Sequence, residues 1–180
     1  AAGHQPELVH VCNSAATLTH PEAHYDLVRC GIAVYGIPPS PALAGIADLR
    51  PAMGLHSEVA FVKRIPAGTA VSYGHAWAAP RDTTVATVPI GYADGIPRRL
   101  SAVGGEVLIG GHRCPLVGRV TMDQLLVDCG DQPVRAGDGV VFIGAQGDDE
   151  LTATDMAQRL DTIAYEVVCD IGSRVRRRYH

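Results

Sequence analysis

The sequence contains very little lysine. Of its 15 lysine and arginine side chains only Lys63 is a lysine. Lys63 lies in the alternating segment Val59-Ala60-Phe61-Val62-Lys63, which is typical of a half-buried strand, so we expect its amine to face solvent. Any chemistry that needs a lysine amine in an active site must therefore use Lys63 or a lysine of another chain.

Aromatic residues, positive charge and long hydrophobic runs are also scarce. Aromatic residues make up 5% of the sequence, the net charge is −4, and the basic residues are scattered. Nucleic-acid binding usually needs a basic face and stacking rings, so we expect no nucleic-acid partner. No apolar run approaches the ~20 residues of a membrane span, and the first residues do not resemble a signal peptide. We expect a soluble, cytoplasmic protein that does not enter a membrane.

The cysteines and histidines follow no disulfide or metal-binding framework. The five cysteines are odd in number and form no C-x-x-C pair, and the eight histidines are spread along the chain. We expect buried free thiols and no metal site.

The composition is that of a folded protein, with 47% hydrophobic and 19% charged residues. In the first part, an apolar run at Leu8–Val11 is predicted to be a strand that leads into a helix opening at Ser14. A second unit of this kind follows, through Asp26–Arg29 and Ile32–Gly36. Two such units predict that residues 1–48 form the C-terminal end of a (β/α)8 barrel. Two strands cannot close a barrel, so we expect the rest of it to precede this chain.

From residue 51 to 180 the pattern changes to short strands separated by glycine and proline turns. The predicted strands are His56–Ile65, Thr83–Ile90, Glu106–Ile109, Cys114–Val117, Gln124–Val127 and Gly139–Ile143. Side-chain oxygens at Thr152–Asp155 predict the start of a helix that continues over Met156–Leu160. The predicted fold class is therefore α/β plus mainly β: a barrel end, then a small β-barrel-like domain.

Two features could carry chemistry. Ser14 at a helix start and Gly31-Ile32 after the next strand could together hold a phosphate, or they could be an ordinary cap and turn. Polar clusters recur where strands meet turns, at Val71–Gly74, Gly91–Arg98 and Gly118–Gln124. Such clusters suit recognition of a small anionic molecule, although turn geometry alone also recruits these residue types.

Taken together and in order, the motifs resemble bacterial alanine racemase. They are Asn-Ser-Ala-Ala from Asn13, Val-Arg-x-Gly-Ile-x-x-Tyr-Gly from Val28, Val-Ser-Tyr-Gly from Val71, Gly-Tyr-Ala-Asp-Gly from Gly91, Gly-Arg-Val-x-Met-Asp-Gln from Gly118, and Tyr-Glu-Val from Tyr165. The resemblance runs from residue 9 to the last residues of the chain.

The resemblance implies pyridoxal 5'-phosphate as cofactor. It assigns the phosphate to Ser14, Gly31, Ile32 and Tyr165, and the pyridine nitrogen to Arg29. A permanently charged arginine at that nitrogen would keep it unprotonated and limit side transamination.

The resemblance also implies a two-base mechanism. Tyr73 would be the catalytic base opposite the cofactor lysine and would contact the substrate, while the backbone N–H of Met122 would bind the substrate carboxylate. Tyr92, Arg98 and Arg119 would line the corridor through which substrate enters.

The implied enzyme is a homodimeric isomerase that supplies D-alanine for cell-wall peptidoglycan. The cofactor lysine and the N-terminal half have no counterpart in these 180 residues. We therefore expect the chain by itself to be inactive. The alternative is a non-catalytic racemase-like β module that binds a partner, but intact Tyr73, Arg29 and Met122 argue against it.

Overall fold

The computed structural model describes residue 3 and residues 6–180, so residues 1–2 and 4–5 of the expected barrel segment lie outside the described residues. The chain divides into two compact units, Ala1–Met53 and Gly54–His180. Within the described residues, none of the helices combines the length and the hydropathy needed to cross a membrane.

The first unit consists of short helices joined by extended segments. α1 spans Ser14–Thr19, and 3-10 helices span Pro21–Ala23, Ile32–Tyr35 and Pro41–Leu43. Asn13 caps α1, because its side chain accepts the N–H of Ala16 at 3.0 Å.

The prediction of a regular strand over Leu8–Val11 is wrong. In the described part of this unit, the only ladder contact is a parallel bridge between Asn13 and Arg29. The Arg29 N–H also donates to the carbonyl of Cys12 at 2.8 Å. A strand requires several consecutive paired residues, whereas these two extended segments meet only at isolated points.

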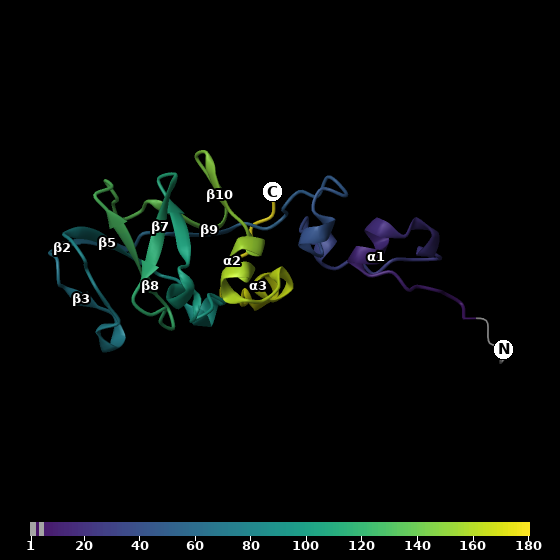
Figure 1. The fold of residues 1–180 in the computed structure, drawn as a ribbon, viewed down its shortest axis with the longest axis horizontal. Helices are drawn as coiled ribbons and strands as arrows, with labels where there is room; N and C mark the ends of the chain where they lie inside the picture. Colours follow the sequence, from purple (N-terminus) through teal and green to yellow (C-terminus); the bar gives the residue numbers. More distant parts are fainter. Residues whose placement is uncertain (1–2, 4–5) are drawn as a thin grey trace. The chain divides into compact units, whose positions relative to one another are not determined.

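An eight-stranded antiparallel sheet forms the centre of the second unit (Figure 1). Its strands are β1 Leu55–Glu58, β2 Phe61–Ile65, β5 Thr83–Val88, β6 Glu106–Ile109, β7 His112–Val117, β8 Leu125–Gly130, β9 Gly139–Gln146 and β10 Asp149–Leu151. A separate two-stranded sheet pairs β3 Ala70–Val71 with β4 Trp77–Ala78. The short strands β3, β4 and β10 were not predicted.

The sheet closes through one bent strand. Its order is β1-β9-β6-β7-β8-β5-β2, and β1 and β2 follow each other directly in sequence. The bend lies at two residues, where the Val59 N–H donates to Asp138 O at 2.9 Å and the Ala60 N–H donates to Thr87 O at 2.8 Å. The predicted strand over residues 56–65 is thus two strands, because it changes partner from β9 to β5. The predicted β-barrel-like domain is confirmed.

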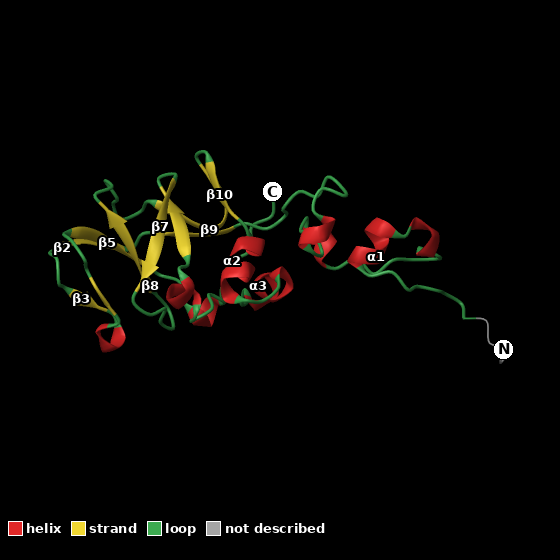
Figure 2. Ribbon diagram, viewed as in Figure 1, coloured by secondary structure: helices red, strands yellow, loops and turns green. Residues whose placement is uncertain are grey.

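Two helices cover part of this barrel. α2 (Ala153–Leu160) and α3 (Ala164–Asp170) pack against each other (Figure 2). The predicted helix start is confirmed: Thr152 Oγ1 accepts the Asp155 N–H at 3.0 Å, and the Asp155 carboxylate accepts the Thr152 N–H at 2.9 Å.

The strands differ in how many of their residues are buried. β8 alternates between buried and half-buried residues, and β5 does so except at the adjacent buried pair Val85 and Ala86, whereas four consecutive residues of β9, Val140–Ile143, are all buried. Phe142 and Met156 line one small hollow, so α2 lies next to β9. The expectation of buried thiols holds for Cys12, Cys114 and Cys129 but is wrong for Cys169, which is exposed on α3.

Candidate active site

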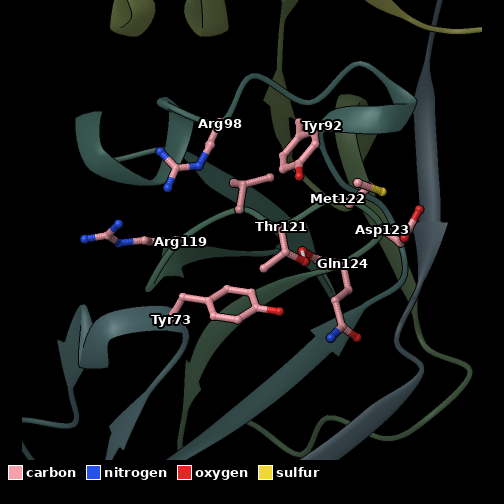
Figure 3. Close-up of a pocket in the computed structure, with 9 residues that line it drawn as sticks. Tyr73, Tyr92, Arg98, Arg119, Thr121, Met122, Asp123 and Gln124 are labelled. Carbon is pink, nitrogen blue, oxygen red and sulfur yellow. Dashed lines mark hydrogen bonds between the residues drawn. The ribbon is translucent and has the colours of Figure 1, made fainter.

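A hollow of about 430 Å³ opens on the second unit where three turns meet (Figure 3). Nine residues line it: Tyr73, Tyr92, Arg98, Arg119, Val120, Thr121, Met122, Asp123 and Gln124. These include all of the candidate residues for the catalytic base, the substrate and the corridor. Thr121, Asp123 and Gln124 had been given no individual role, and only their place in the Gly118–Gln124 cluster indicated them.

The turns that carry Tyr92 and Met122 are joined through their main chains. The Tyr92 N–H donates to Thr121 O and the Ala93 N–H donates to Met122 O, both at 3.0 Å. Gly91 makes this approach feasible, since a Cβ there would lie 2.2 Å from Thr121 O. Two walls of the hollow therefore form one hydrogen-bonded unit.

A buried carboxylate and an arginine reinforce the same pair of turns. Asp94, only 8% exposed, accepts the Gly91 N–H at 2.9 Å and lies 3.3 Å from Arg174 Nε. Arg174 also donates to Asp123 at 2.6 Å, and this hydrogen bond is the main cause that raises the pKa of the Arg174 guanidinium. Sequence reasoning missed Arg174, because its partners come from motifs about 50 and 80 residues earlier.

Met122 lies at the tip of a tight turn. Thr121 donates both its N–H, at 3.0 Å, and its hydroxyl, at 2.7 Å, to Gln124 O, and the residues between them project outward. Met122 is 52% exposed. Among the described residues its own N–H has no acceptor. This N–H is therefore free to donate to a bound carboxylate.

Tyr73 follows the strand β3 and begins a short 3-10 turn, Tyr73–His75. Its side chain is 74% exposed, and Figure 3 shows the ring below Thr121 with the hydroxyl directed toward the side of Gln124. The phenol is thus presented to the hollow and is not packed in the core.

Arg98 and Arg119 lie on one side of the hollow (Figure 3). Neither guanidinium forms an ion pair or a side-chain hydrogen bond within the described part of the chain, and both residues are exposed. Two cations without carboxylate partners favour an anionic molecule in the space beside them.

The first unit brings Ser14, Gly31 and Ile32 together. Ser14 is buried, and its Oγ accepts the N–H of Gly31 at 2.9 Å and that of Ala33 at 3.3 Å. Its hydroxyl hydrogen remains available as a donor, as does the N–H of Ile32, which has no acceptor among the described residues. A Cβ on Gly31 would meet nothing within 4 Å, so the space beside it is open.

Two candidates, Arg29 and Tyr165, remain. Arg29 is exposed and donates to Val11 O at 3.3 Å. Tyr165 belongs to α3 of the second unit, where it is 37% exposed and is not part of the hollow. Within residues 3 and 6–180, no group of three or more histidine, cysteine, aspartate or glutamate side chains is arranged to hold a metal ion.

Comparison with known proteins identifies relatives of both units. Residues 52–179 match the family model of the alanine racemase C-terminal domain, and residues 1–39 match that of the alanine racemase N-terminal domain. The alanine racemase of Symbiobacterium thermophilum is 53% identical over 180 residues, which are 99% of this chain and 48% of that protein. The chain thus spans about half the length of the curated relatives it matches.

Solved structures agree in fold. The alanine racemase from E. faecalis superposes with a TM-score of 0.92 at 42% identity, over 98% of this chain and 47% of that one. The alanine racemase from Bacillus anthracis, solved with bound L-Ala-P, superposes with a TM-score of 0.91 at 43% identity, over 96% and 45% of the two chains. The chain belongs to the alanine racemase family.

Proposed function

We propose that this chain is part of an alanine racemase, an isomerase that interconverts L-alanine and D-alanine with pyridoxal 5'-phosphate. The observation that carries the proposal is the hollow of the second unit, in which an exposed phenol, a free backbone N–H and two unpaired arginines lie together. These are a proton-transfer group, an N–H that can donate to a carboxylate, and cations that attract the carboxylate of an amino acid.

The residues of the first unit fit a phosphate. The Ser14 hydroxyl and the Ile32 N–H are unused donors, and Gly31 leaves space beside them. The Gly31 N–H is engaged by Ser14, so a phosphate would have to compete for it. Tyr165 would add a phenol donor, and Arg29 would face the pyridine nitrogen. When bound, the cofactor withdraws electron density from the substrate Cα and makes its proton removable.

The second unit would hold and deprotonate the substrate. The Met122 N–H donates to the substrate carboxylate, which orients Cα. The Tyr73 hydroxyl oxygen removes or returns the Cα proton on one face. Tyr92, Arg98 and Arg119 select small molecules that carry a carboxylate as they enter. Binding and orientation of this kind make the proton transfer effectively intramolecular.

The second base must come from elsewhere. Lys63 is exposed on β2 and does not line the hollow. In this proposal a lysine outside this chain holds the cofactor. In this proposal residues 1–48 end a cofactor-binding barrel and residues 51–180 form the domain that carries Tyr73. The complete enzyme is a cytoplasmic homodimer that makes D-alanine for peptidoglycan, and this chain alone is inactive.

Replacement of Tyr73 by phenylalanine in the complete enzyme tests the proposal. Loss of a general base typically lowers the rate by ~10²- to 10⁴-fold. L- and D-alanine have equal free energies in water, so kcat/KM must fall equally in both directions. In D2O, however, the remaining base should still exchange the Cα proton of one enantiomer. The control Tyr179→Phe, at a residue that is 91% exposed, should change neither rate.

Racemisation and exchange that continue unchanged in Tyr73→Phe would remove Tyr73 from the mechanism. A complete enzyme that binds alanine without any Cα exchange would instead support the non-catalytic module, which the match to an alanine racemase over 99% of this chain does not favour.

A further inference from the structure

The backbone of Ser72, directly before Tyr73, adopts a conformation that is strained for any residue except glycine. Its φ is +68° and its ψ is 170°. This region of the φ/ψ map is essentially restricted to glycine, because a Cβ collides with the neighbouring carbonyl groups. A non-glycine residue persists there only when the surrounding structure holds it.

Two hydrogen bonds from another turn hold Ser72. Its Oγ accepts the Arg119 N–H at 2.9 Å and donates to the Arg119 carbonyl at 3.4 Å. The contact spans 47 positions of the sequence. One hydroxyl therefore satisfies both main-chain groups of a residue that lines the hollow.

Gly118 provides the space for this contact. Its φ is +71°, and a Cβ at this position would lie 2.4 Å from the Ser72 Cβ. Real carbon atoms do not approach so closely, so an alanine at position 118 would displace Ser72 or its own turn. The contact between the two turns therefore depends both on the hydroxyl of Ser72 and on the absence of a side chain at Gly118.

Among the described residues, the tip of the β3–β4 hairpin makes no other hydrogen bond to a distant segment. Val71 and Trp77, the strand pair next to the turn, pack against Ile65, Ala79 and Val85. At the tip, the His75 N–H donates to Ser72 O at 3.1 Å, a hydrogen bond within the turn itself. The side chain of Tyr73 is largely exposed, so packing does not fix it.

We propose that Ser72 is a positioning residue, which holds the Tyr73 turn against the Arg119 segment and so keeps the Tyr73 phenol over the hollow. Its role in catalysis rests on the proposed racemase function. The Ser72–Arg119 contact also connects the turn that carries Tyr73 to the segment that presents the Met122 N–H, three positions after Arg119. The strained φ of Ser72 then sets the direction in which Tyr73 leaves the hairpin.

The contact itself is tested by hydrogen exchange of the Arg119 amide in the complete, cofactor-loaded enzyme. Ser72→Ala removes the acceptor and keeps the strained backbone, whereas Ser72→Gly removes both the acceptor and the strain. Both should speed exchange of the Arg119 amide at least ~10-fold, while the control Ser57→Ala on β1 should leave it unchanged. Unchanged exchange in Ser72→Ala would overturn the inference.

The positioning role is tested by combining substitutions. Ser72→Ala should lower kcat about 10- to 100-fold with a smaller effect on KM, because misplacement of a reacting group by ~1 Å has effects of this size. In the Tyr73→Phe background the same substitution should cause no further loss. Losses that multiply in the double variant would show a general structural effect and would overturn the positioning role.

Gly118→Ala provides a reciprocal test. It should lower kcat more in the wild-type background than in Ser72→Gly, where the colliding Cβ is absent. Equal effects in the two backgrounds would contradict the proposed contact. An enzyme that shows the expected Arg119 exchange but no Cα exchange would overturn the racemase function and leave the Ser72–Arg119 contact standing.

Discussion

Glycine residues, which have no side chain, determine how closely the turns around the hollow approach one another. Gly91 has an extended backbone, with φ −150°, so any residue could adopt its conformation. The requirement for glycine comes instead from space, since its absent Cβ would lie 2.2 Å from Thr121 O and 2.4 Å from Met122 O. Those atoms belong to the main chain and cannot rotate away.

Gly91→Ala should therefore separate the Tyr92 turn from the Met122 turn. Overpacking of this kind typically lowers the free energy of unfolding by ~1–3 kcal/mol. Chemical denaturation measures the loss, and the amide signals of Tyr92 and Ala93 should shift as their hydrogen bonds lengthen. Gly139→Ala is the control, because a Cβ there meets only the end of the Gln146 side chain at 3.7 Å. Equal stability of the two variants would contradict this account.

Between elements, an ion-pair network joins the β10 hairpin to β6, β7 and α2. Arg113 on β7 makes two hydrogen bonds to the Asp149 carboxylate, at 2.7 and 2.6 Å, and lies 3.6 Å from Glu106 on β6. Arg159 on α2 pairs with Glu106 and donates to Gly104 O. The hydrogen bonds from Arg113 are the main cause that holds the pKa of Asp149 below its usual range.

Asp149→Asn should make stability less dependent on acid pH. A carboxylate whose pKa is lower in the folded protein adds stability above its unfolded pKa, near ~3.9, and loses it as pH falls through the folded value. The urea midpoint of Asp149→Asn should lie below that of the wild type at pH 7, and the difference should vanish as the pH falls below that range. Asp148→Asn, in the adjacent exposed turn, should match the wild type at both pH values. A pH-independent difference would mean that the ion pair is not its cause.

The second unit as a whole depends on a barrel closed by the bent strand β1–β2 and covered by α2. Phe142 of β9 is 1% exposed and is among the largest fully buried side chains, whereas the other phenylalanine, Phe61 on β2, is 58% exposed. The two phenylalanines thus differ in burial although they belong to the same barrel.

Phe142→Ala should lower the free energy of unfolding by ~3–5 kcal/mol, the usual effect of removing a buried ring. Phe61→Ala should change it by no more than about 0.5 kcal/mol, because that ring is already in water. Urea denaturation of the two variants measures both values. A large loss in Phe61→Ala would contradict the exposure of its ring.

Much of the second unit was predictable because its signals are local. Strand β6 matches its predicted bounds, and the Thr152–Asp155 capping box begins α2 as predicted. Both depend on residues within a few positions of one another. The strand predicted over Leu8–Val11 failed for the opposite reason, since a strand exists only where a neighbouring segment pairs with it.

The sequence by itself determined the family resemblance, the alternation of the strands, the turn glycines and the residue types offered as a site. Only the tertiary structure decided that three turns meet in one hollow, that Arg174 bridges Asp94 and Asp123, and that the strained Ser72 is held by the Arg119 main chain. Strand pairing and barrel closure set the distances between these segments, and a local pattern of residues does not predict such distances. Propensity acts within a few residues, whereas a site depends on which distant main-chain groups the closed sheet brings within hydrogen-bond reach.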